Sequence, residues 1–147
     1  MLKCIAAAAA VALATAGLAL AAGSAKVTLS ATLTPKAEVP APKGAAGASG
    51  SFRATVVATS STVKVTYTLT FKGLTGPATA SHIHVGKVGV AGPVAAALCG
   101  PCHTGQHGTV VVTKAQWAAI AKGGAYVNVH TAKNPGGEIR GQLKVSR

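Results

Sequence analysis

Acidic residues are nearly absent from this chain. Glu38 and Glu138 are the only two, against 14 lysines and arginines, and the formal net charge is +12. A hydrolase with paired carboxylates would have to use both acids, and no Gly-x-Ser-x-Gly segment is present for a serine nucleophile. The glycine pairs at 123–124 and 136–137 fit turns better than phosphate-binding loops. We therefore do not expect an enzyme.

Aromatic residues are also scarce, at 3% of the chain, and the basic residues are scattered singly. Proteins that bind nucleic acid usually combine basic clusters with aromatic rings on which bases stack. A specific nucleic-acid partner is therefore not expected. The positive balance favours an anionic envelope or an extracellular polymer as partner instead.

The first 25 residues have the features of a secretory signal peptide. Lys3 gives a positive start, residues 4–20 form an Ala-rich apolar run, and small residues follow at Ala19-Leu20-Ala21 or Gly23-Ser24-Ala25. The alternative is a retained membrane anchor, which requires about 20 strongly apolar residues. We predict a cleaved signal over residues 1–25, a secreted or periplasmic protein, and no stable membrane insertion after cleavage.

Only three cysteines are present, and removal of the leader would leave the pair Cys99 and Cys102. Outside the cytoplasm the default for such a close pair is a disulfide. Three other chemistries compete. The Cys-x-x-Cys-His spacing with His103 matches c-type haem attachment, Cys-Gly-Pro-Cys resembles the thioredoxin redox motif, and His103 with His107 could complete a metal site.

Most of the remaining sequence favours β-strands. Seven runs are rich in Val, Thr, Ile, Tyr and Phe and are separated by Gly, Pro or Ser clusters: residues 26–34, 51–59, 62–71, 81–86, 108–113, 125–131 and 138–145. One short helix is predicted after Thr113, where Thr113 to Gln116 has the form of a capping box. Residues 26–147 are therefore predicted to form one all-β domain, a Greek-key antiparallel sandwich or barrel of about seven strands.

Three histidines lie in strands whose apolar and polar residues alternate. If Ile83, Val85, Val127, Val129, Ile139 and Leu143 face the core, parity places the alternate residues on one polar outer surface. These are His82, His84, Tyr126, Asn128, His130, Glu138, Arg140 and Gln142.

Two histidines at i and i+2 on one strand can reach the same ion, and a third on a neighbouring strand would complete three nitrogen ligands. The sequence thus predicts a copper or zinc site at His82, His84 and His130. The alternative is a metal-free polar network, in which Glu138 or Glu38 pairs with Arg140 and the histidines bond to backbone carbonyls.

Three stretches carry a family resemblance: Ala80 to Gly86, Tyr126 to Thr131, and Gly137 to Gln142. Together with the opening segment Leu33 to Pro40 they resemble the CHRD domain, first described in chordin and widespread in bacterial secreted proteins. The resemblance implies an all-β binding or structural module rather than a defined activity.

A second, more remote resemblance is to copper-zinc superoxide dismutase, itself an antiparallel sandwich. It matches His82, His84 and His130 to three copper ligands and Arg140 to an anion-guiding arginine. The chain has no bridging histidine and no Asp for a zinc site. We expect an exported binding module; the alternative is an extracytoplasmic redox protein, either a c-type haem carrier or a superoxide-dismutase-like enzyme.

Overall fold

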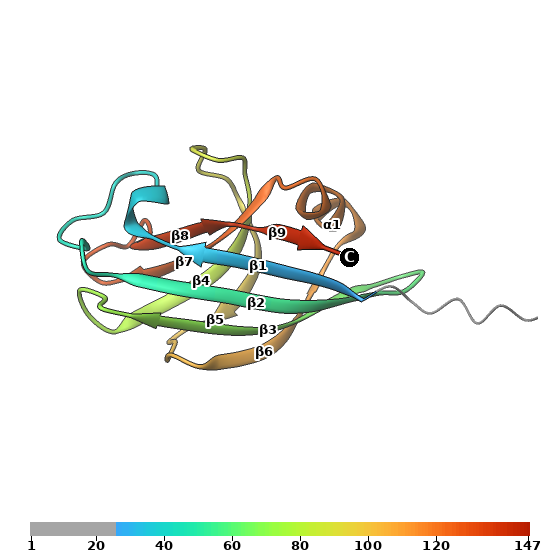
Figure 1. Ribbon diagram of the computed structural model, residues 1–147, viewed down its shortest axis with the longest axis horizontal. Coiled ribbons are helices and arrows are strands. Elements are labelled where there is room, and N and C mark those ends of the chain that lie inside the picture. Colours follow the sequence, from blue (N-terminus) through green and yellow to red (C-terminus); the bar gives the residue numbers. More distant parts are fainter. Residues whose placement is uncertain (1–25) are drawn as a thin grey trace, which may run out of the picture.

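The computed structural model describes residues 26–147, which form two antiparallel sheets packed face to face (Figure 1). The predicted signal peptide lies outside the described residues. In chain order the elements are β1 (Val27–Leu33), the short 3-10 helix η1 (Pro35–Ala37), β2 (Ser49–Ala58), β3 (Val63–Lys72), β4 (Ala78–Val85), β5 (Val94–Cys99), β6 (Gln106–Val112), α1 (Lys114–Ala121), β7 (Ala125–Thr131), β8 (Ile139–Gln142) and β9 (Lys144–Ser146).

One sheet has five strands in the order β6-β3-β2-β1-β9, and the other has four in the order β5-β4-β7-β8. The predicted break at Ser60 and Ser61 is the turn of the β2–β3 hairpin, whose last pair is Ala58 with Val63. The all-β sandwich predicted from the strand pattern is therefore confirmed.

Side chains from the inner faces of both sheets form the core. Phe52 and Leu69 from the larger sheet and Ile83, Val127 and Ile139 from the smaller one have no exposed surface. The predicted inward parity is confirmed for five of the six residues, Ile83, Val127, Val129, Ile139 and Leu143, while Val85 is only half-buried.

Two differences raise the strand number from about seven to nine. The segment between the predicted strands 81–86 and 108–113 contains an additional strand, β5, and Gln106 and His107 already belong to β6. The expected C-terminal strand over 138–145 is divided: β8 pairs with β7, whereas β9 pairs with β1 in the other sheet. The chain thus passes from one sheet to the other between Gln142 and Lys144, which alternation alone does not show.

The capping box is present at the start of α1. Thr113 Oγ1 accepts a bond from Gln116 N, and Gln116 Oε1 accepts one from Thr113 N. Ile120 is fully buried and Trp117 packs against the core. Within residues 26–147 no helix is long and apolar enough to cross a membrane.

Candidate metal centre

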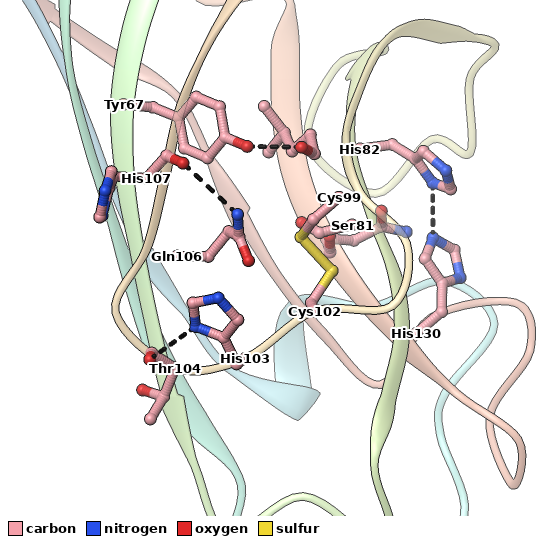
Figure 2. The surroundings of a disulfide bond; sticks show 12 residues. Tyr67, Ser81, His82, Cys99, Cys102, His103, Thr104, Gln106, His107 and His130 are labelled. Atoms are coloured by element: carbon pink, nitrogen blue, oxygen red, sulfur yellow. Dashed lines mark hydrogen bonds between the residues drawn. A yellow bond between two sulfur atoms is a disulfide. The ribbon is translucent and has the colours of Figure 1, made fainter.

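Two adjacent strands bring the three predicted histidines together. His82 and His84 lie on β4, and His130 lies on the neighbouring strand β7. One ring nitrogen of each lies within 4.8 Å of the others, and within residues 26–147 this is the one cluster of at least three side chains that could hold a metal ion. Figure 2 shows the rings of His82 and His130 directed toward each other.

Hydrogen bonds fix which ring nitrogen carries each proton. Nδ1 of His84 lies 2.8 Å from Gly92 O, and Nδ1 of His130 lies 2.9 Å from Pro135 O. A carbonyl oxygen can only accept, so both Nδ1 atoms donate and both Nε2 atoms keep their lone pairs. Nδ1 of His82 lies 3.0 Å from Nε2 of His130 and is therefore the donor of that bond when all rings are neutral.

Burial favours the neutral form of His82 and His130 by lowering the pKa of each ring. It lowers the pKa of His82 below 6.5, with smaller contributions from His130 and His84. Burial also lowers the pKa of His130, although its bond to Pro135 acts in the opposite direction. Neutral imidazole is the form that binds metal ions, so the ligand form persists at lower pH than for an ordinary histidine.

The donor set fits an imidazole-binding metal. Two nitrogens bound to one tetrahedral ion at about 2.0 Å lie about 3.3 Å apart, close to the 3.0 Å between His82 Nδ1 and His130 Nε2. Nε2 of His84 is buried without a hydrogen-bond partner, which is costly unless a ligand occupies it. Carbonyls that orient Nδ1 of two rings are the usual outer support of histidine ligands.

The polar face was predicted to be exposed, and this is wrong. Tyr126, Asn128 and Arg140 are at most 2% exposed, and His84 and His130 are each 9% exposed. Residues 86–93, here called the covering loop, lie over this side of the sheet and bond to its side chains. Sequence parity shows which face a residue occupies, but not whether a distant loop covers that face.

Arg140 is held between the sheet and the covering loop. Its Nη2 donates to Lys87 O at 2.9 Å and to Val90 O at 3.0 Å, and its guanidinium carbon lies 3.4 Å from the centre of the Tyr126 ring. The Tyr126 ring is stacked on His84, with centroids 4.8 Å apart. Arg140 therefore supports the candidate ligand His84 through Tyr126. The sequence marks Tyr126 by its outward parity and as the first residue of a stretch that resembles the CHRD domain, but neither signal predicts its stacking on His84.

The two carboxylates occupy different surroundings. Glu138, one of the two acids expected to pair with Arg140, instead accepts bonds from Thr75, Thr131 and Asn134. Glu38 is buried with Oε2 unpartnered, and burial raises its pKa above 4.5 despite its bond from Val39 N and the positive charge of Arg140.

The predicted disulfide is present: Cys99 and Cys102 are joined (Figure 2). His103 and His107 are exposed, and their Nδ1 atoms lie near the carbonyls of Thr104 and Gly105, so neither joins the three-histidine cluster. In this oxidised state both sulfur atoms are bonded to each other and not available for a porphyrin.

The fold and the covered histidine cluster define a class, an all-β sandwich module with a candidate metal site. The CHRD domain model matches residues 29–143, so the chain belongs to the CHRD domain family. The matched range contains all three histidines, Arg140 and the disulfide. No curated protein and no solved structure matches the chain significantly.

Proposed function

We propose that this protein is an exported CHRD binding module, not an enzyme, that holds one copper or zinc ion through His82, His84 and His130. The observation that carries the proposal is the buried, unpartnered Nε2 of His84, whose lone pair is fixed by the bond of Nδ1 to Gly92 O. Imidazole suits both metals.

The hydrogen bonds also define how each ring would bind. His84 and His130 would use Nε2. His82 would use Nδ1, because its Nδ1 faces Nε2 of His130. Binding therefore requires the His82 proton to move from Nδ1 to Nε2, which replaces the His82–His130 hydrogen bond with two bonds to one ion.

Calorimetric titration of the purified protein with Zn²⁺ and Cu²⁺ tests the proposal. Replacing His82, His84 or His130 by Ala should weaken binding by about 100-fold, since loss of an outer-shell partner alone typically costs 10- to 100-fold. Matched controls are His103→Ala and His107→Ala, which remove exposed histidines outside the cluster and should leave binding unchanged. Binding that survives His130→Ala, or that is no tighter than millimolar, would contradict the site and favour the metal-free polar network.

Two measurements on the same samples distinguish a redox protein from a binding module. Covalent haem would give visible absorbance and a haem-stained band on a denaturing gel. If the copper-loaded protein removes superoxide and His84→Ala abolishes this activity, the superoxide-dismutase-like alternative is favoured. Neither activity is expected of a binding module.

A further inference from the structure

The outer face of the five-stranded sheet has an unusual composition that the metal site does not explain. Its outward side chains, here called the hydroxyl face, are mostly hydroxyls and cations: Thr28, Ser30, Thr32, Ser49, Ser51, Arg53, Thr55, Val57, Lys64, Thr66, Thr68, Thr70, Lys72, His107, Thr109, Val111, Lys144 and Ser146. No acidic side chain and no Phe, Tyr or Trp ring belongs to it.

The hydroxyls are aligned across the sheet. One row runs over all five strands and consists of Ser146, Thr28, Thr55, Thr66 and Thr109, each paired with the next. Neighbouring strands are about 4.8 Å apart, and outward side chains along a strand repeat at about 6.8 Å. The face is therefore a regular grid of groups that both donate and accept hydrogen bonds.

The next row adds positive charge to this grid. It consists of Lys144, Ser30, Arg53, Thr68 and His107 in register. A shallow groove of about 570 Å³ lies along the two rows and is lined by Thr28, Arg53, Thr66 and His107 among others. A linear polymer lying across the strands would contact hydroxyls and cations together.

The charge of the whole chain determines the sign of the partner. Glu38 is 4% exposed and Glu138 is fully buried, so both acidic side chains of the chain are withdrawn from the surface. The charged side chains of the hydroxyl face are thus all cations, and an anionic partner meets no side-chain repulsion there.

We propose that the hydroxyl face binds a linear anionic polysaccharide, such as a polyuronate, whose hydroxyls and carboxylates match the Thr and Ser rows and the Arg53 and Lys144 cations. Nucleic acid fits less well because the face has no Phe, Tyr or Trp ring on which bases stack and His107 is its one imidazole, since Tyr67 points into the core and is 3% exposed. A lipid surface fits less well because only Val57 and Val111 offer apolar area. This inference is independent of the metal site.

Binding of oligomeric alginate to the purified protein at low salt, followed by calorimetry, tests the proposal. The double variant Arg53→Gln/Lys144→Gln should bind about tenfold more weakly, because exposed charge contacts each contribute a fraction of the binding free energy. The matched control Lys36→Gln/Lys122→Gln removes the same charge from exposed lysines off this face and should bind as the original protein does.

A second pair isolates the hydroxyls at constant charge. Thr55→Val/Thr66→Val keeps the strand shape but removes two hydroxyls from the five-strand row, and it should weaken binding by about tenfold. Thr79→Val removes one hydroxyl from an exposed position on β4, in the other sheet, and should have no effect.

Three results would overturn the assignment. Equal losses in the face and control variants would show attraction to net charge alone. Absence of alginate binding would show that the hydroxyl face does not bind this anionic polysaccharide. Tighter binding to double-stranded DNA or to phosphatidylglycerol vesicles than to alginate would assign the face to nucleic acid or to a membrane.

Discussion

Glu138 shows how a single buried charge is made tolerable in this protein. Its carboxylate accepts bonds from Thr75 N at 2.6 Å, from the hydroxyls of Thr75 and Thr131 at 2.5 Å, and from Asn134 Nδ2 at 2.9 Å. Burial alone raises the pKa of Glu138, but these donors outweigh it and hold the pKa below 4.5. The residue therefore joins the β7–β8 turn to the segment before β4.

Replacing Glu138 by Gln should destabilise the protein by about 2 to 3 kcal/mol, because an amide nitrogen would face donors that need an acceptor. Urea unfolding at neutral pH measures this. The matched control is Glu38→Gln, whose Oε2 accepts no bond and which should cost about 1 kcal/mol or less. Equal losses in the two variants would contradict the role given to the Glu138 donors.

The lowered pKa of Glu138 also makes stability depend on pH. In the unfolded chain this carboxyl has its ordinary pKa of about 4.5. The ionised Glu138 therefore adds its full contribution to the free energy of unfolding above that pH, and this contribution is lost as the pH falls through the lower pKa of the folded state. Glu38 has the opposite effect on stability. Because its pKa is raised in the folded state, its contribution to the free energy of unfolding is complete below pH 4.5 and is lost as the pH rises through the folded pKa. Between about pH 6 and pH 3 the urea midpoint of the original protein should decrease relative to that of Glu138→Gln, because only the original protein has the Glu138 contribution to lose, whereas both retain Glu38.

At the scale of an element, α1 is too short to be stable alone and is fixed by its first turn. Gln116 bonds twice: Oε1 accepts from Thr113 N at 2.8 Å, and Nε2 donates to Ala95 O in β5 at 3.1 Å. The capping box thus joins the helix to the edge of the four-stranded sheet as well as closing its N-terminus.

Thr113→Ala should therefore lower the free energy of unfolding by about 1 kcal/mol, because Gln116 N loses its acceptor. Thr113→Ser retains the hydroxyl and should restore most of this stability. Thermal unfolding followed by circular dichroism compares the two variants. If Ser is as destabilising as Ala, packing of the threonine methyl rather than capping accounts for the loss.

At the scale of the whole molecule, the exposed charged side chains are all positive. The net charge is +12 and both acidic side chains are buried, so exposed cations have no side-chain partners of opposite sign. Such a surface favours solubility and anion binding but opposes compaction through self-repulsion.

Moderate NaCl should therefore raise the free energy of unfolding, since screening acts over about 10 Å at 0.1 M and weakens repulsion in the compact state most. Urea unfolding at 10 mM and 200 mM NaCl measures the change. A variant such as Lys122→Glu, which provides a surface carboxylate, should show a smaller salt effect. A decrease in stability with salt would indicate attractive surface pairs instead.

The sequence by itself determined the fold class, the inward residues and the face of its own strand on which each histidine lies. Period-two alternation is a local property, so Ile83, Val127 and Ile139 could be assigned to the core and the three histidines to the opposite face of their strands. That β4 and β7 are neighbours, which brings the histidines together, is a result of the tertiary structure. The close spacing of Cys99 and Cys102 likewise needed no long-range information. The capping box at Thr113 is also local, because its partners are three residues apart.

Only the tertiary structure decided what lies over that face and which strands share a sheet. The covering loop is attached by contacts such as Arg140 to Lys87 O and Gly92 N to Tyr126 OH, which join segments 53 and 34 residues apart. The separation of β8 from β9 and the surroundings of Glu138 depend on similarly distant partners. Burial of a polar side chain is determined by these long-range contacts, and therefore the lone pair of His84 Nε2, central to the proposed metal site, becomes visible only in the folded molecule.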